Sequence, residues 1–273
     1  MSLTAATRAE TTKQFTTSIW WILAIVLVVY VGGTTSALAF VFAASAAGAI
    51  PGGDAPPVPV DGLPALLYSS ATAFGYVFPL LIGTLMVTTE FRHQTLTPTF
   101  LATPRRGRVL AAKLAVAVLV GALFGVIGIV SSVGPSAALL AGFGLETELA
   151  SSDTWAMIGR MLVAYVLWAL VGVGVGALVR NQVGAIVGVL VFTQFLEPIG
   201  RTASGFVEGL SEVTQYLPGA ASDALVGASI YTMSVPGASF SQLEWWAGGL
   251  VLLGYAIVFV LLGHVVSWRR DVG

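Results

Sequence analysis

EFRHQTLTPTFLATPRRGR, residues 90–108, is the most polar and most basic stretch of a chain that is otherwise largely apolar. It separates two long apolar runs, so we expect it to form a loop between two membrane spans. Within the loop, Thr97 can cap a helix, Pro98 suits the first helical position, and Pro104 prevents the helix from continuing. The stretch therefore predicts a helix of about two turns between the spans.

The composition indicates an integral membrane protein. Of the 273 residues, 56% are hydrophobic and only 9% are charged, with a mean hydropathy of +0.91. Globular proteins carry roughly 25% charged residues. A formal net charge of -1 gives no electrostatic basis for binding nucleic acid, so we expect no nucleic-acid partner. Because the chain has no cysteine, disulfides, thiolate metal sites and cysteine nucleophiles are excluded.

Six segments are apolar and long enough to cross a bilayer, which predicts an all-α membrane protein with a single transmembrane domain over residues 1–273. The segments are residues 19–43, 66–88, 109–133, 155–179, 183–199 and 246–267. Residues 1–18 form either a tail or an interfacial helix. We expect residues 134–153 to fold back at the membrane surface, and residues 200–245 to form a small helical region outside the spans.

The cationic residues set the orientation, because Lys and Arg near span ends are retained in the cytoplasm. With the N-terminus inside, ten of the twelve lie on the inner side, and only Arg160 and Arg201 lie outside. We therefore place both termini and the loop 89–108 in the cytoplasm, and the region 200–245 outside the cell. Aromatic and cationic side chains that anchor spans at the membrane interface are expected at Trp20, Trp21, Trp268, Arg269 and Arg270.

Small residues recur at four-residue spacing within the spans, which in lipid allows helices to approach closely. The pairs are Gly121 with Gly125, Gly172 with Gly176, and Gly184 with Gly188.

Catalytic signatures are missing from the sequence. It contains no GxxxxGKS or GxxxxGKT phosphate loop, no HExxH and no GxSxG. His93 and His264 lie far apart, so we expect no metal site, no catalytic residue and no cofactor bound by this chain. The chain is not expected to be an enzyme, and energy from a nucleotide must reach it through a partner.

The run from Glu90 to Arg106, followed by RVLAAKL over residues 108–114, resembles the loop between the second and third spans in permease subunits of type-two ATP-binding-cassette (ABC) exporters. In that family the pattern is a glutamate, a basic turn, a Thr-Leu step, a short helix, a proline, a basic pair and a lysine entering the next span. The six-span layout, with an outer helical region between spans five and six, is similar to the family as well.

The resemblance implies a transmembrane permease that works with separate P-loop ATPase subunits, which bind the ATP and Mg. A second permease copy or a paralogue would complete a dimer. The implied cargo is hydrophobic or amphipathic, drug-like or lipid-like, and leaves across the plasma membrane. Richness in Ala, Gly and Val with a single asparagine, Asn181, is associated with GC-rich bacterial genomes, so we expect multi-pass insertion in a bacterial inner membrane.

In the predicted coupling loop, Leu96, Phe100 and Leu101 lie at near-helical spacing and have no core of their own to join, so they suit a groove in another protein. We expect the basic side chains to contact acidic groups on that partner or anionic lipid headgroups. Alternatively, they only determine on which side of the membrane the loop lies. The residues expected to couple to the ATPase are Glu90, Arg92, His93, Thr95, Leu96, Thr97, Pro98, Phe100, Leu101, Pro104, Arg105 and Arg106.

By the resemblance, spans two and five line the substrate pathway. The candidates are Phe74, Phe78, Thr84, Phe192, Gln194, Phe195 and Glu197. A carboxylate facing lipid is costly, so Glu197 either sits at the outer interface or faces a wet cavity. Two other functions share the topology: a non-transporting membrane anchor or regulatory subunit of an ATPase complex, and a passive channel, which would need rings of polar residues in its pore.

Overall fold

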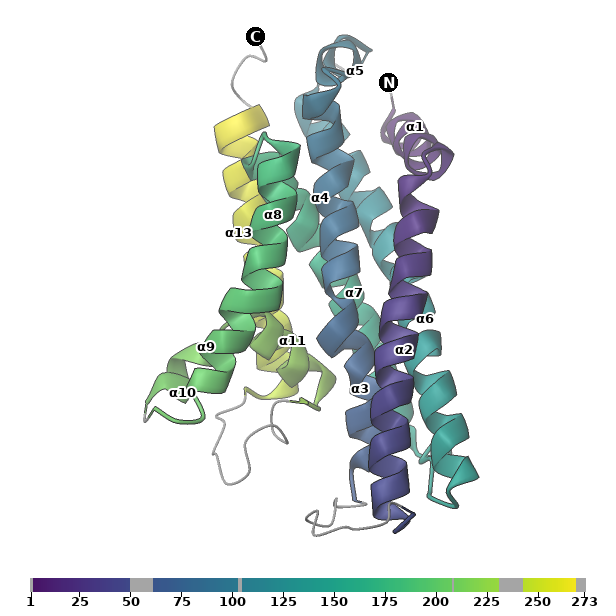
Figure 1. Cartoon of the computed structure of the whole chain (residues 1–273). Coiled ribbons are helices and arrows are strands. Elements are labelled where there is room, and N and C mark those ends of the chain that lie inside the picture. Colours follow the sequence, from purple (N-terminus) through teal and green to yellow (C-terminus); the bar gives the residue numbers. More distant parts are fainter. Residues whose placement is uncertain (1, 50–60, 103–104, 208, 231–242, 269–273) are drawn as a thin grey trace.

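The computed structural model describes residues 2–49, 61–102, 105–207, 209–230 and 243–268, and every regular element in them is a helix (Figure 1). Six helices are long and apolar enough to cross a membrane. This confirms the predicted all-α class and the number of candidate spans, and indicates a multi-pass membrane protein. Of the predicted interface anchors, Arg269 and Arg270 lie outside the described residues, and of Trp268 only the backbone is described.

The six spans are built from ten of the described helical elements. The first span is α2 (Ile19–Ala46), and the second consists of α3 (Leu63–Gly75) and α4 (Val77–Arg92). The third is α6 (Arg106–Gly142) and the fourth is α7 (Ser152–Leu178). The fifth joins α8 (Gln182–Val191), the π-helical turn η1 (Phe192–Leu196) and α9 (Glu197–Ala203). The sixth is α13 (Trp245–Gly263), which continues into η2 (His264–Trp268).

The third span is longer than the sequence predicts. Helix α6 continues through Pro135 to Gly142, where we expected the chain to have folded back already. A proline is tolerated inside a membrane helix because neighbouring groups satisfy the carbonyl that it frees. The helix ends where Gly144 takes a left-handed φ of 74°, a conformation that glycine adopts without cost.

Helix α7 lies at the centre of the bundle and packs against α4, α6 and α13. Its two largest fully buried side chains are Tyr165 and Trp168, and their polar atoms are satisfied. Tyr165 Oη donates to the carbonyl of Ala71 at 2.6 Å, and Trp168 Nε1 donates to Ser222 Oγ at 3.1 Å. Buried donors without partners are costly, so these bonds fix how the surrounding helices meet α7.

Two of the three predicted glycine pairs do bring helices together. A Cβ added at Gly121 or Gly125 would meet atoms of α7 within 3.0 Å, and one at Gly176 would lie 2.5 Å from the carbonyl oxygen of Thr84 in α4. The prediction is wrong for Gly184 and Gly188 of α8. Among the described residues nothing lies within 4 Å of a Cβ at Gly188, and at Gly184 the three nearest atoms all belong to Asn181 in the preceding turn.

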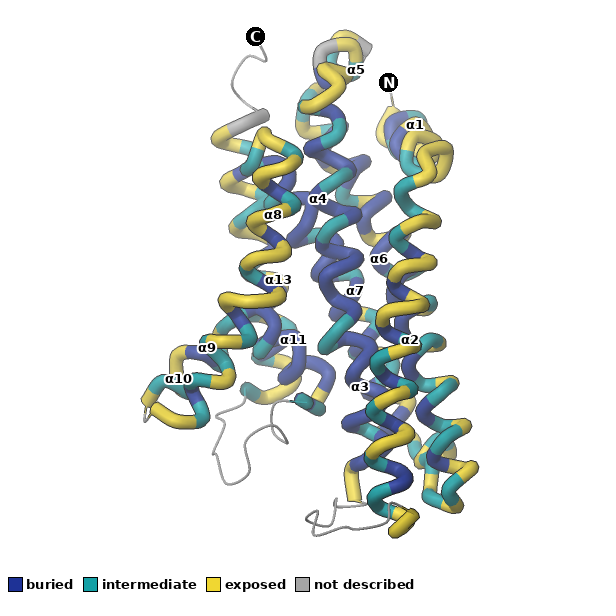
Figure 2. The backbone as a smooth tube through the Cα atoms, in the orientation of Figure 1, coloured by how far each residue is buried: buried dark blue, intermediate teal, exposed yellow. Residues whose placement is uncertain are grey.

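Burial is unevenly distributed over the spans (Figure 2). The helices α3, α4 and α7 are largely buried, whereas α2, α8 and α13 carry long exposed stretches. Exposed positions on these helices are apolar, for example Val29 at 69%, Val183 at 63% and Leu250 at 59%. An apolar exposed face is what a helix in contact with lipid requires.

Short helices cover the two ends of the bundle (Figure 1). One end, here the α1/α5 end, carries α1 (Leu3–Thr16), α5 (Leu96–Ala102) and the end of α13. Residues 1–18 are therefore helical over most of their length. The opposite end, here the α9/α11 end, carries α9, α10 (Leu210–Thr214) and α11 (Pro218–Val226). These last two helices supply the helical region expected between spans five and six.

Candidate functional site

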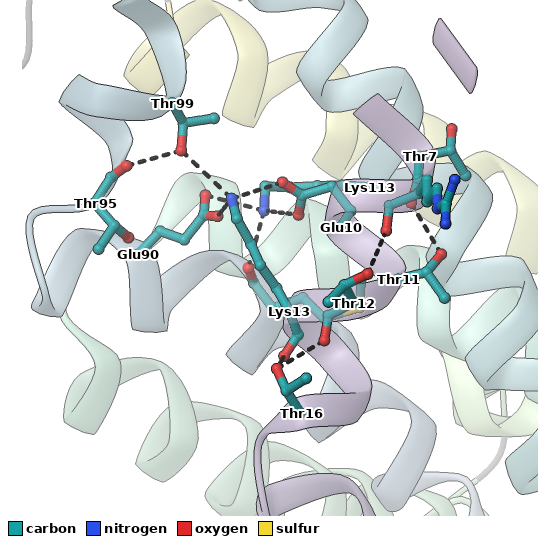
Figure 3. A network of polar contacts seen from close by, with 12 residues as sticks. Thr7, Glu10, Thr11, Thr12, Lys13, Thr16, Glu90, Thr95, Thr99 and Lys113 are labelled. Atoms are coloured by element: carbon teal, nitrogen blue, oxygen red, sulfur yellow. Dashed lines mark hydrogen bonds and ion pairs between the residues drawn. The ribbon is translucent and has the colours of Figure 1, made fainter. Parts of the chain in front are cut away.

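Four charged side chains from three helices meet at the α1/α5 end (Figure 3). Glu10 and Lys13 belong to α1, Glu90 to the last turns of α4, and Lys113 to the beginning of α6. Lys13 Nζ lies 2.9 Å from Oε1 of both Glu10 and Glu90. Lys113 Nζ lies 2.6 Å from Glu10 Oε2 and 2.9 Å from Glu90 Oε2. Each lysine therefore contacts both glutamates; we call these residues the four-charge cluster.

The four-charge cluster is mostly buried. Lys113 is 0% exposed and Glu10 and Glu90 are each 6% exposed, whereas the side chain of Lys13 is 46% exposed. Lys113 Nζ also lies 3.3 Å from the carbonyl of Met86, to which it donates a hydrogen bond. Buried charges persist only when they are paired and hydrogen-bonded, and breaking one such pair typically costs about 3–5 kcal/mol. The cluster therefore ties α1, α4 and α6 together.

The electrostatics of α1 follow from these pairs. Burial alone would raise the pKa of Glu10, but the charges and hydrogen bonds of Lys113 and then Lys13 outweigh it, so the pKa lies below its ordinary value. For Lys13, burial lowers the pKa, but Glu90 and Glu10 outweigh it and the pKa is raised. Both groups are therefore held in their charged forms.

The position of α1 depends on its own sequence. Ser2 caps the helix by accepting a hydrogen bond from the amide of Ala5 at 3.2 Å. Glu10 and Lys13 are three residues apart and share one face. At the junction with α2, Trp20 Nε1 donates to the carbonyl of Phe15 at 3.1 Å, and the two rings meet edge to face. The adjacent Trp21 is 46% exposed.

Sequence reasoning missed Glu10 and Lys13 as site residues. Glu10 lies 103 positions from Lys113, and Lys13 lies 77 positions from Glu90, so no local pattern links them. One signal was present: a lysine inside a predicted span needs a buried acidic partner. Lys113 falls within the segment 109–133, and this requirement could have led to the search for its partners.

Helix α5 is joined to the four-charge cluster. Thr99 Oγ1 donates to the carbonyl of Thr95 at 2.8 Å and accepts a hydrogen bond from Lys13 Nζ at 3.4 Å. The turn before α5 is sharp: Gln94 has a φ of 54°, and the amide of Thr95 donates to the carbonyl of Glu90 at 3.1 Å. The short helix is therefore fixed to α4 and α1 together.

The predicted start of the short helix is wrong by two residues, about half a turn. The helix begins at Leu96, and the amide of Thr99 donates to the carbonyl of Thr95 at 3.3 Å, so Thr95 precedes the helix where Thr97 was expected to cap it. Pro98 is inside the helix. Of Thr97 only the backbone is described, and Pro104, the predicted stop, lies outside the described residues.

The three apolar side chains of α5 differ in exposure. Leu96 is 2% exposed and Leu101 is 78% exposed, while Phe100 is half-buried under the guanidinium of Arg106 at 5.1 Å. The expectation that Leu96 has no core to join is therefore wrong: it points inward and anchors the helix. Leu101 is left as the apolar residue that α5 presents outward. The basic side chains of the loop are exposed at Arg92, His93 and Arg105.

The predicted pathway residues do not form one surface within this chain. Phe74 and Phe78 lie against Tyr30 of α2, at ring-centroid distances of 6.4 and 6.1 Å. Thr84 is fully buried where α4 meets α7. The other candidates are in the fifth span: Phe192 is half-buried, Gln194 and Phe195 are exposed, and Glu197 is 1% exposed.

A pocket of about 310 Å³ lies beside the four-charge cluster, between α1 and α4, and is lined in part by Glu10, Lys13 and Glu90. Within the described residues, no group of three or more His, Asp or Glu side chains is arranged to hold a metal ion. In the four-charge cluster both lysines are paired with both glutamates, an arrangement suited to fixing the relative positions of helices.

The chain matches no protein-family model and no curated protein.

Proposed function

We propose that this protein is the permease subunit of an ATP-driven exporter of the type-two ABC family, which moves a hydrophobic or amphipathic molecule out across the plasma membrane. The basis is the resemblance of residues 90–114 together with the geometry of α5. Charge bias supports placing the α1/α5 end in the cytoplasm, where a soluble ATPase can reach it.

The observation that carries the proposal is that α5 is anchored by its first residue and exposed on its other side. Leu96 is buried and Thr99 is bonded to Lys13, whereas Leu101 is 78% exposed. A partner that places an apolar groove over Leu101 would therefore hold an element that contacts the rest of the bundle through Leu96 and Thr99. Recognition of a short helix in an apolar groove is a common mode of protein association.

Movement of α5 has a physical route into the spans. The helix connects directly to α4 and α6, and the four-charge cluster links both to α1, which continues into α2. From α4 the close contacts at Gly172 and Gly176 lead to α7. Tightly packed helices shift as units because they cannot deform continuously. A displacement of α5 by ATPase subunits would thus reposition four of the six spans.

In the complete transporter, two permeases would pair with two ATPase subunits, either as two copies of this chain or with a paralogue. Membrane lipid would surround the apolar faces of α2, α8 and α13. Nucleotide binding and hydrolysis belong to the ATPase in this proposal, since the sequence carries no phosphate loop.

The test is association with a P-loop ATPase encoded beside this chain, comparing Leu101→Asp with Val213→Asp. Val213 is 67% exposed on α10 at the opposite end, so the same substitution there controls for general effects of the charge. Loss of an apolar anchor should weaken co-purification by about tenfold or more in Leu101→Asp only. ATP-dependent export from vesicles should fall with it.

Undiminished association and export in Leu101→Asp would refute the proposed coupling. If the complex forms but no cargo ever alters its ATP turnover, the protein is a membrane anchor or regulatory subunit. Leu96 is unsuitable for this test, because an aspartate at a buried position would disturb the fold itself.

A further inference from the structure

Arg160 of α7 is a cation near the α9/α11 end of the bundle that no described acidic residue neutralises. The other cation that the charge bias places at this end, Arg201, is paired with Asp223 Oδ2 at 2.6 Å and donates to Ser229 Oγ at 3.2 Å. Among the described residues, no carboxylate forms an ion pair with Arg160. A charge within a membrane span is costly unless it is paired, so the partner of Arg160 has to be sought outside these residues.

The guanidinium of Arg160 has hydrogen-bond donors without acceptors. It carries five N–H donors in a planar fork, and none of them donates to a residue that the structure describes. Only Nε is both buried and unpaired, so the two terminal nitrogens keep accessible surface. A ligand can therefore reach these two nitrogens from outside the bundle.

Three helices hold this fork in place. Its central carbon, Cζ, lies 5.8 Å from the ring centroid of Trp245, the first residue of α13. One terminal nitrogen, Nη2, lies beside Gly227 at the end of α11, where an added Cβ would be 3.3 Å away from it. The C-terminus of a helix carries partial negative charge, which favours a cation at this position. Arg160 is thus positioned by α7, α11 and α13 together.

Exposed tryptophans indicate the depth of Arg160 in the membrane. Trp155 near the start of α7, and Trp245 and Trp246 at the start of α13, are each more than half exposed. Tryptophan is enriched where a membrane span meets the lipid headgroups. Because the guanidinium lies over the ring of Trp245, its terminal nitrogens lie at the level of the headgroup phosphates.

We propose that Arg160 binds the phosphate of an anionic phospholipid at the α9/α11 end of the bundle. A guanidinium and a phosphate pair through two parallel hydrogen bonds, and a guanidinium that is already held in one orientation loses less entropy in forming them. A zwitterionic lipid carries its own ammonium group, so an anionic headgroup offers Arg160 more net negative charge. The site goes beyond the proposed function, because it involves neither the ATPase nor α5.

The experiment measures photo-cross-linking of lipid to the purified full chain in phosphatidylcholine nanodiscs, without any ATPase. The minor component is a photoreactive phosphatidylglycerol or a photoreactive phosphatidylcholine with the same acyl chains, and mass spectrometry locates the cross-links. Phosphatidylglycerol should label residues 152–163 and 243–252 more strongly than phosphatidylcholine does. Arg160→Met should lower this labelling by about tenfold, because it removes both the charge and the fork. Labelling of residues 90–102 at the opposite end is the internal control and should not change.

A matched pair of variants keeps the test decisive if Arg160→Met does not fold. Trp245→Leu removes the ring that holds the guanidinium and should lower phosphatidylglycerol labelling at this end several-fold. Trp246→Leu removes a similarly exposed tryptophan from the same helical turn, and should leave the labelling nearly unchanged.

Equal labelling of residues 152–163 and 243–252 by the two lipids, or undiminished phosphatidylglycerol labelling in both Arg160→Met and Trp245→Leu, would overturn the proposal. An equal fall at residues 90–102 would show that Arg160→Met acts through the net charge of the chain, which would also refute it. Inorganic phosphate is added as a competitor. If it displaces phosphatidylglycerol from this end alone, Arg160 holds a free phosphate and the lipid assignment is wrong.

Discussion

Two sites with buried carboxylates lie at opposite ends of the bundle and are neutralised in different ways. At the α1/α5 end, Glu10 and Glu90 are each paired with both Lys13 and Lys113. At the α9/α11 end, Glu197 is held on one oxygen by the backbone amides of Gly219 and Ala220, and its other oxygen has no hydrogen bond from the described residues.

The two ends of the bundle therefore differ in how their buried carboxylates are neutralised. Two lysines facing two glutamates leave no net charge, so the four-charge cluster has nothing further to attract and serves to hold α1, α4 and α6 together. At Glu197 the hydrogen bonds come from backbone amides, which carry only partial charges.

The largest effect is expected from breaking the cluster at its most buried member, Lys113. Lys113→Met leaves two buried carboxylates with the half-exposed Lys13 alone, which should cost about 3–5 kcal/mol of stability. Thermal unfolding in detergent, followed by tryptophan fluorescence and size exclusion, measures the loss. Arg180→Met removes a cation outside the cluster and should have a much smaller effect. An unchanged melting temperature in Lys113→Met would show that the cluster does not hold the helices.

A smaller effect is expected from displacing Glu197 through its backbone partner. A Cβ at Gly219 would lie 2.6 Å from Glu197 Oε1, so Gly219→Ala must push the carboxylate away from the amides. The loss of these bonds at a buried group should cost about 1–3 kcal/mol. Gly188→Ala is the matched control, because its Cβ meets nothing within 4 Å. Equal melting temperatures in the two variants would contradict the assigned geometry.

The smallest effect concerns the pH dependence of the cluster. The lowered pKa of Glu10 adds stability that is fully present above its ordinary value of 4.5 and is lost as pH falls through the lower folded value. The raised pKa of Lys13 adds stability that is present below 10.5 and is lost as pH rises through the higher folded value.

Hydrogen exchange of the α1 amides, after correction for the intrinsic pH dependence of exchange, should therefore show a plateau of protection between pH of about 4.5 and 10.5. Glu10→Gln should remove the acid-side loss of protection, because the titrating group is gone. Protection that changes steadily across this plateau in the wild type would contradict the pairing of Glu10 with the lysines.

The sequence was sufficient for features that depend on local composition. Six candidate spans follow from runs of apolar residues, because every membrane segment must satisfy its backbone internally and face lipid with apolar side chains. The presence of a short helix between spans two and three also followed from local signals. The residue at which this helix starts did not follow from local signals, because Thr95 and Thr97 are equally good caps by residue type. In the structure the helix starts after Thr95.

Patterns that look alike in the sequence had different outcomes. The pairs Gly121 with Gly125 and Gly172 with Gly176 pack against neighbouring helices, whereas Gly184 and Gly188 line a cavity. The spacing of small residues says that a close approach is permitted, and only the arrangement of the other helices decides whether one takes place. Leu96 and Leu101 differ in the same way, since both are leucines on one short helix and only Leu101 is exposed.

By itself, the sequence determined the membrane class, the number of candidate spans and the existence of a polar helical loop after Glu90, because hydropathy and helix signals act over a few neighbouring residues. The tertiary structure alone decided that Lys113 meets Glu10, that Leu96 is buried, and that one oxygen of Glu197 is buried without a hydrogen bond from the described residues. These features join residues far apart in the chain, and their energies exist only once the helices have packed.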